Sequence, residues 1–240
     1  MAIRGGPDII EDGLVLHLDA ADQNSYPLSG DTWYDLSGND NHGYFVNGPT
    51  YDSTRKGNVS FDGSNDYVRI GASNQNNIQL SANFTLSLTF EQTSTRWDWV
   101  RLFGHTGSTR YWGLWLPGTN STTYNNSSAS TRMLTQSYDG GGSSTYSGSY
   151  IFSLNKVHHV VYTATNSTKK FYVNGNLLST HNLSGTIAYT SHTGNILIGW
   201  GQAHIYHIGR VYNAMIYNDK VLTDDEILQN YNATKGRYGL

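Results

Sequence analysis

Apolar and polar residues alternate along two segments of this sequence, and this period of two constrains the fold more than any other feature. From Phe84 to Phe90 every second residue is Phe or Leu, and Thr, Ser and Thr stand between them. Residues 14–19 repeat the alternation with three leucines. Because successive side chains of a strand point to opposite faces of a sheet, each segment is predicted to form a half-buried β-strand.

Other segments are rich in Tyr, Thr, Val, Ile and Trp, which favour strands. The predicted strands are 59–61, 67–70, 99–103, 111–116, 157–163, 170–173, 196–200 and 205–217. Gly, Asn, Ser and Asp fill the gaps, as turns require. Asn174 and Gly175 predict a type I′ hairpin turn. The chain has only three glutamates, a residue that long helices use heavily, so the expected class is all-β.

One short helix is expected near residues 224–234. Thr223 has the spacing of a capping box with Glu226, and Gly236 is a plausible end. The length of 240 residues fits a single β-sandwich domain. We expect an N-terminal arm at 1–12, a domain at 13–240 and a polar loop insertion at about 117–148.

Composition excludes several classes of protein. Charged residues make up 14%, and the net charge is −3, so no basic surface for nucleic acid is expected. The chain has no cysteine, which excludes disulfides and thiol catalysis. Its apolar runs are too short to span a membrane. The first residues lack the apolar core of a secretory signal peptide, so none is expected.

Several motifs then occur together in a fixed order. They lie at residues 13–22, 33–43, 60–68, 171–175 and 209–227. In this order and spacing the chain resembles the laminin-G-like branch of the concanavalin A-like lectin/glucanase superfamily, over residues 13–235. The resemblance implies a two-sheet antiparallel jelly-roll sandwich whose first and last strands pair.

The whole chain also resembles stand-alone virion proteins of tailed bacteriophages, which decorate the capsid or belong to the tail. That resemblance implies a virion location and other virion proteins as partners. It implies a homo-oligomer or many copies on a particle, with host-surface glycans as a further partner and no membrane insertion. The alternatives are a free carbohydrate-binding lectin and a degenerate glycoside hydrolase.

Catalytic residues are not expected. The glucanases of the superfamily carry a strand with a Glu-x-Asp-x-(x)-Glu motif, which sets two carboxyl groups at a hydrolytic spacing. Here only Asp224 and Glu226 are acids two residues apart, and they lie at the predicted helix start. Glu91 has Thr89 and Thr93 at the matching positions.

A cluster of aromatic residues is the candidate sugar site. Indole rings stack on the apolar faces of sugars, and polar side chains nearby bind the hydroxyl groups. The candidate residues are Trp97, Trp99, Trp112, Trp115, Arg110 and Tyr124. The alternative is that these rings pack in the core, as is expected for Trp33 and Trp200.

Calcium is the one cofactor that the sequence suggests. Asp35, Asn39 and Asp40 lie in a loop rich in oxygen donors, which calcium prefers. The alternative is that these residues close Asx turns. His158 and His159 are adjacent, so they are expected on opposite faces of a strand. In the N-terminal arm, Ile9 and Ile10 are predicted to contact another subunit; the alternative is that the arm packs across its own domain as an edge strand.

Overall fold

The computed structural model describes residues 7–71, 78–97, 99–105, 112–116, 125–127, 130–131, 134–137, 144–146, 150, 152–182, 194–200 and 205–240. Within these ranges no helix has the length and apolar character needed to cross a membrane.

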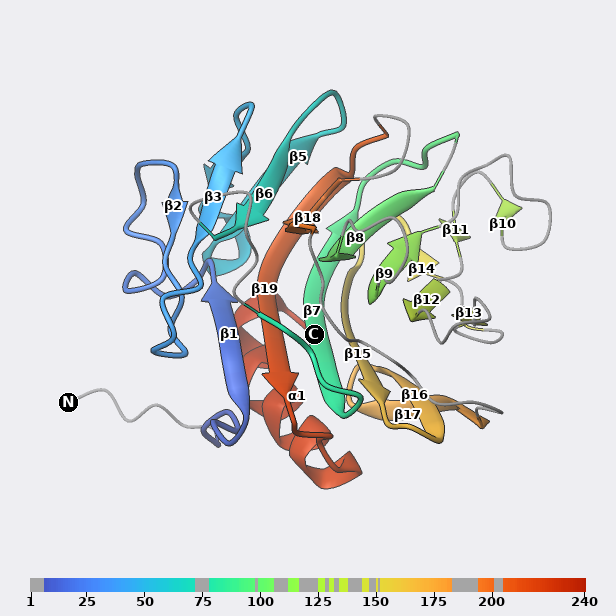
Figure 1. The fold of residues 1–240 in the computed structure, drawn as a ribbon. Helices are drawn as coiled ribbons and strands as arrows, with labels where there is room; N and C mark the ends of the chain where they lie inside the picture. The colour runs from blue at the N-terminus through green and yellow to red at the C-terminus, as the bar shows by residue number, and fades with distance from the viewer. Residues whose placement is uncertain are drawn as a thin grey trace.

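Two large antiparallel sheets form a sandwich, which confirms the predicted fold class. Sheet A runs in the order β17 (Asn176–Asn182), β16 (Thr168–Val173), β15 (Val157–Ala164), β7 (Phe84–Gln92), β19 (Ile208–Asn218), β5 (Asn58–Asp62) and β4 (Thr50–Asp52). Strand β1 (Leu14–Asp19) also pairs with β19, as expected for the first and last strands. Figure 1 shows β1, β19, β7 and β15 side by side, with the C-terminal helix behind them.

Sheet B forms the second layer. Its order is β13 (Ser144–Tyr146), β12 (Leu134–Ser137), β9 (Trp112–Leu116), β8 (Val100–His105), β18 (Ile196–Ile198), β6 (Tyr67–Ile70), β3 (Gly43–Val46) and β2 (Thr32–Trp33). A small third sheet holds β10 (Asn125–Ser127), β11 (Ser130–Thr131) and β14 (Phe152–Ser153). Four of these strands, β10 to β13, lie in the predicted polar insertion at 117–148, whose other residues lie outside the described ranges.

The main core lies between the two sheets. The Phe and Leu side chains of β7 point into it and meet Phe103, Leu114 and Ile198 from sheet B. The prediction that β7 is half-buried is wrong, because all nine of its residues are buried. The reason is the helix α1 (Asp224–Tyr238), which packs on the outer face of sheet A. The Thr, Ser and Glu residues of β7 are therefore buried between the sheet and the segments that cover it.

The predicted helix cap and hairpin turn form as expected, but the helix does not end where it was predicted to end. Thr223 and Glu226 make a capping box at the start of α1. Asn174 and Gly175 have φ angles of 50° and 80°, which is the left-handed geometry of the predicted hairpin turn between β16 and β17. The helix continues past Gly236 and ends at Gly239, which takes the left-handed conformation at φ 73°.

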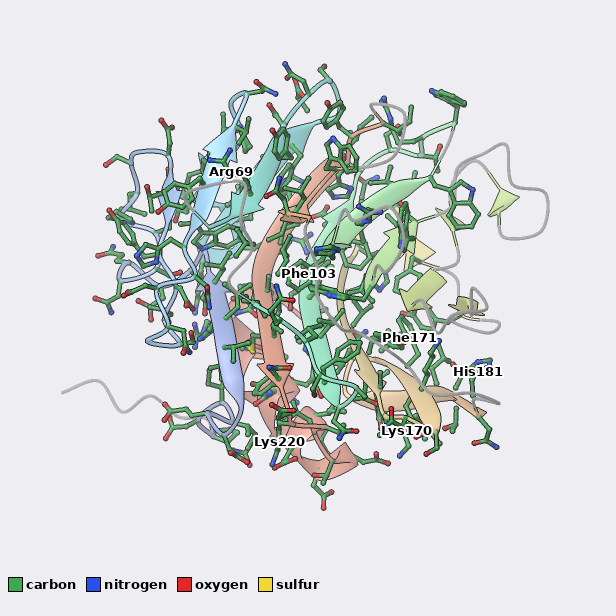
Figure 2. All side chains as sticks on the ribbon, viewed as in Figure 1. Arg69, Phe103, Lys170, Phe171, His181 and Lys220 are labelled. Carbon is green, nitrogen blue, oxygen red and sulfur yellow. The ribbon has the colours of Figure 1, made fainter. Side chains whose placement is uncertain are left out.

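Residues 7–12 of the predicted arm lie against their own domain. Ile9 and Ile10 pack on the apolar cluster between sheet A and α1. The backbone N–H of Ile10 donates to Asn230 Oδ1 at 2.8 Å, and its carbonyl accepts from the Tyr217 hydroxyl at 2.9 Å. Lys220, at the lower end of Figure 2, pairs with Asp12 at 3.0 Å. The alternative had this segment pack on its own domain as an edge strand; it does pack there, but it forms no strand, since β1 begins at Leu14. A contact of Ile9 and Ile10 with another subunit stays a prediction.

Candidate functional site

The predicted sugar-binding residues do not form one surface. Trp112 is fully buried and lies in the main core, with its ring 6.1 Å from that of Phe103. Trp115 is 3% exposed, Trp99 is half-buried and Trp97 is 57% exposed. Arg110 and Tyr124 lie outside the described residues. Because Trp112 points between the sheets, a sugar could reach it only if the core opened.

Five residues on the outer face of sheet B form a continuous array, which we call the aromatic belt. Tyr67 stacks on Tyr206, with ring centroids 6.4 Å apart. Tyr206 pairs with Trp200 through an isolated β-bridge. The guanidinium carbon of Arg101 lies 5.6 Å from the Trp200 ring and 4.2 Å from the Trp115 ring. The belt therefore runs across β6, the end of β18, β8 and β9, which are neighbours in the sheet (Figure 1).

Strand alternation places the belt on the outer face. Val68 points into the core, so the adjacent Tyr67 points outward. Leu114 and Leu116 of β9 point into the core as well, so Trp115 between them points outward. In the register of β8 and β9, Arg101 stands directly opposite Trp115, which brings the guanidinium over the indole.

Two facing glycines let β8 and β9 lie close together, and one of them also makes room for the Trp115 indole. Gly104 and Gly113 are paired across β8 and β9. A Cβ atom on Gly113 would lie 3.3 Å from Trp115 Nε1, and one on Gly104 would lie 2.4 Å from the Trp112 carbonyl oxygen. Gly104 also has a φ of 159°. A side chain at Gly104 would therefore force the backbone of β8 and β9 apart.

Two residues of the belt are partly accessible to solvent, and the other three are buried. Tyr67 and Trp200 are half-buried, and each keeps part of its surface in solvent. Tyr206, Arg101 and Trp115 are 8%, 2% and 3% exposed. The Trp115 indole N–H has no hydrogen-bond partner among the described residues. Three buried groups therefore fix the position of two accessible rings.

A large groove elsewhere on the described surface suits a sugar less well. It has a volume of about 1210 Å³ and lies between residues 7–14 and the C-terminal half of α1. Asp8, Glu11, Asp22 and Arg237 are among its lining residues, and no Trp, Tyr or Phe lines it. Without an aromatic face, the groove lacks the surface on which a sugar ring stacks.

In the oxygen-rich loop at 35–42, the carboxylate oxygens of Asp35 are bound by groups of the protein itself. The carboxylate of Asp35 accepts backbone N–H bonds from His17, Ser37 and Asn41 at 2.8, 2.9 and 3.0 Å. It also accepts from the Ser37 hydroxyl at 2.7 Å, so each carboxylate oxygen takes two hydrogen bonds. These N–H and O–H groups bound to Asp35 fit the predicted Asx turns better than a calcium site. Calcium binding here stays a prediction.

The other two predicted calcium ligands, Asn39 and Asp40, have different surroundings from Asp35. Asn39 donates its amide N–H to the Ser37 hydroxyl at 3.0 Å. The Asp40 side chain is 92% exposed, and its carboxylate lies 3.9 Å from the His42 ring nitrogen Nε2. Within the described ranges, no three His, Cys, Asp or Glu side chains are placed to hold a metal ion.

The acids singled out by the sequence have partners within the fold. Glu91 accepts a hydrogen bond from Tyr212 at 2.8 Å and pairs with Arg210 at 3.4 Å. Burial and the hydrogen bond to Glu91 raise the pKa of Tyr212, which therefore remains a donor. Asp224 accepts from Tyr172 at 2.7 Å, and this hydrogen bond lowers the pKa of Asp224. Both carboxylates bind protein groups on the side of sheet A that α1 covers.

His158 and His159 lie on opposite faces of β15, as predicted. His158 packs on Phe152, 5.0 Å between ring centroids, and on Phe90. His159 lies on the outer face, where its Nε2 is 3.0 Å from the Ser87 hydroxyl. Burial lowers the pKa of His159 to about 4, so this ring is neutral at pH 7.

A sequence profile of the concanavalin A-like lectin/glucanases superfamily (Laminin_G_3) matches residues 62–228, more than half of the chain. No curated protein matches the sequence significantly.

Solved structures with the same fold include three proteins of different kinds. Domain 4 of AbnA, a GH43 extracellular arabinanase from Geobacillus stearothermophilus in complex with arabinotriose, is 14% identical with a TM-score of 0.69, and the match covers 92% of this chain and 100% of that domain. The binding domain of Paraclostridial Mosquitocidal Protein 1 is 17% identical with a TM-score of 0.67, covering 93% and 52%. Trypanosoma rangeli sialidase in complex with sialic acid is 19% identical with a TM-score of 0.60, covering 93% and 33%. This chain thus spans about half of the toxin domain and a third of the sialidase.

Proposed function

Because the chain belongs to the concanavalin A-like lectin/glucanase superfamily, we propose that it is a non-enzymatic carbohydrate-binding protein whose sugar site is the aromatic belt. The observation that carries this proposal is the pair of half-exposed rings, Tyr67 and Trp200, held by the buried Tyr206 and Arg101. Rings that are already fixed lose little conformational entropy when a ligand stacks on them. The arabinanase domain of the same fold, solved with arabinotriose, supports this reading.

Arg69 is a polar side chain beside the belt, and it is labelled in Figure 2. It stands two residues after Tyr67 on β6, so by strand alternation both side chains leave the same face of the sheet. The Trp115 N–H is not such a group, because it is buried and lies against Gly113, where a ligand oxygen would not reach it.

The setting we propose is a bacteriophage particle, as a capsid decoration or a tail-associated protein. The support is the resemblance of the whole sequence to stand-alone virion proteins of tailed phages. On such a particle, many copies of the belt would bind host-surface glycans and add adhesion. Mass spectrometry of purified particles tests this setting: recovery of the chain in stoichiometric amounts supports it, and absence from washed particles contradicts it.

The absence of catalysis is proposed from the placement of the acids. Glu91 is 3% exposed and bound to Arg210 and Tyr212. Hydrolysis needs two carboxyl groups that face the scissile bond at a defined separation. We expect no release of reducing sugar from plant or bacterial glycans by the pure protein. Steady release that is abolished by Glu91→Gln would overturn this part of the proposal.

A glycan array, followed by titration of the best ligand, tests the sugar site itself. Trp200→Ala and Tyr67→Ala should each weaken binding about tenfold, because a stacked ring contributes about 1 kcal/mol or more. Tyr34→Ala is the matched control, since Tyr34 is also an exposed aromatic residue, at 42%, and packs on His42 away from the belt. Equal loss in the control, or unchanged affinity in both belt variants, would contradict the assignment.

A further inference from the structure

A pocket on the outer face of sheet A combines hydroxyl groups, charged groups and an apolar wall. It has a volume of about 580 Å³ and lies between the turn that joins β15 to β16 and the start of α1. Lys170, which lines it, is labelled in the lower part of Figure 2. Because the aromatic belt lies on the outer face of sheet B, the pocket and the belt are on opposite sides of the sandwich.

The segment between β19 and α1 forms one wall of the pocket, and Thr85 of β7 holds it in place. The Thr85 hydroxyl accepts the backbone N–H of Leu222 at 3.0 Å and donates to the carbonyl oxygen of Lys220 at 3.2 Å. Val221 and Leu222 line the pocket from this segment. They give it an apolar side whose position is fixed by hydrogen bonds to the sheet.

Thr163 is a buried polar residue that faces the pocket. Tyr162 and Ala164 on either side of it point into the main core, so Thr163 leaves the outer face of β15. The residue is 2% exposed and lines the pocket, and its hydroxyl has no hydrogen-bond partner among the described residues. A buried hydroxyl that lacks a partner is unfavourable, and a ligand oxygen in the pocket would supply one.

Asp224, at the start of α1, places a carboxylate at the same pocket. Its Oδ1 atom accepts hydrogen bonds from the Tyr172 hydroxyl at 2.7 Å and from the Lys170 ammonium at 3.3 Å. The hydrogen bond from Tyr172 lowers the pKa of Asp224, so the group is ionised at pH 7. The side chain is 60% exposed, and within the described part of the chain Oδ2 accepts no hydrogen bond. The pocket therefore offers an acceptor in Asp224 and a donor in Lys170.

We propose that this pocket binds a single sugar residue, as a site separate from the aromatic belt. Each sugar hydroxyl can both donate and accept a hydrogen bond, so one ring can bind Asp224, Lys170 and Thr163 together. Its apolar C–H groups would pack on Val221 and Leu222. The volume lies within the range of small-molecule sites.

The charges at the pocket favour a neutral ligand. A simple cation would be repelled by the ammonium of Lys170, and an anion would be repelled by the carboxylates of Asp224 and Asp225, which also lines the pocket. The proposal does not depend on the belt. If both sites bind sugar, one chain can connect glycans on two sides of the sandwich.

Thr163→Val tests the pocket without changing its shape, because a methyl group replaces the hydroxyl. Thr89→Val is the matched control. Thr89 is also a buried threonine of sheet A, 1% exposed, whose hydroxyl has no partner among the described residues, but it does not line the pocket. Both variants remove an unpaired hydroxyl, so both should fold. Asp224→Asn is a second variant, which removes the negative charge and keeps the size of the side chain.

NMR titration with D-glucose, D-galactose and N-acetyl-D-glucosamine measures the outcome. At least one of these sugars should shift the methyl signals of Val221 and Leu222 with saturation, at a Kd of about 1 mM, as expected for a ligand of this size. Thr163→Val should weaken this binding about fivefold, because one hydrogen bond is lost. Asp224→Asn should also weaken it, and Thr89→Val should bind as the wild type does.

The absence of saturable shifts at Val221 and Leu222 with all three sugars would overturn the proposal. Wild-type affinity in both Thr163→Val and Asp224→Asn would overturn it as well. The indole signal of Trp200 is followed in the same titration and reports on the belt alone. Failure of the pocket and failure of the belt are therefore seen separately.

Discussion

The hydroxyl of Tyr238 donates a hydrogen bond to Asp19 at 2.7 Å, which ties the last turn of α1 to the end of β1. Arg237 pairs with the other oxygen of the same carboxylate. Asp19 also accepts the backbone N–H of Ala21 at 2.9 Å. The end of β1 and the last turn of α1 are therefore joined at one buried acid, and this contact helps to hold α1 over sheet A.

Tyr238→Phe should lower the free energy of unfolding by about 1–2 kcal/mol, because it removes one hydrogen bond to a buried carboxylate and leaves the ring in place. Urea unfolding measures the change. Tyr34→Phe serves as control, since Tyr34 is 42% exposed, and should leave the midpoint unchanged. Equal midpoints for wild type and Tyr238→Phe would show that this bond does not stabilise the fold.

Stability should fall as the pH is lowered from about 6.5 to 4. Burial lowers the pKa of His159 and of His207 to about 4. In the unfolded chain both rings take up protons near pH 6.5, whereas in the folded protein they remain neutral until about pH 4. Within that window each histidine should therefore lower the free energy of unfolding by about 1.4 kcal/mol for each unit by which the pH falls. Above about pH 6.5 it should have no such effect.

Urea unfolding at a series of pH values measures this slope. His207→Leu should reduce it, because one of the buried histidines that bind a proton only in the unfolded chain is lost. A free energy of unfolding that stays constant from pH 7 to 4.5 would contradict the neutral, buried state of these rings.

Ile10→Ala should destabilise the isolated protein, because Ile10 packs on the cluster between sheet A and α1. The expected loss is about 1–2 kcal/mol, below the usual cost at a fully buried isoleucine, since Ile10 is half-buried. Thermal unfolding of the purified protein measures it. No change in the isolated chain, combined with loss from assembled particles, would instead support an assembly role for this residue.

Calcium removal should have little effect on stability. Both oxygens of the Asp35 carboxylate accept hydrogen bonds, which come from Ser37, Asn41 and His17. The loop therefore needs no ion to hold its shape. Adding a chelator should leave the melting temperature unchanged. A chelator that unfolded the domain would show that metal binding contributes to folding.

The local patterns of the sequence predicted the strands and the helix cap well. The segment 67–70 forms β6 with the expected bounds, and Thr223 caps α1. These features depend on near neighbours in the chain. The burial of the polar face of β7 could not be predicted this way, because it depends on α1, which packs there from far along the sequence.

The candidate site shows the same limit. Trp97, Trp99, Trp112 and Trp115 are close together in the chain, and this closeness predicted a shared sugar site. The belt instead joins Trp115 to Trp200 and Tyr206, which come from a distant part of the chain, and Trp200 had been expected in the core. Strand parity could have identified Tyr67 as outward-facing, but only the strand order of sheet B places it beside Tyr206.

The most direct test of the sugar site follows the tryptophan indole N–H signals by NMR while the glycan preferred on the array is added. The belt assignment predicts that the signals of Trp200 and Trp115 shift with saturation, while those of Trp33 and Trp112, which are fully buried in the core, stay in place. Saturable binding that moves only Trp97, or that leaves Trp200 and Trp115 unmoved, would place the site elsewhere and contradict the central claim.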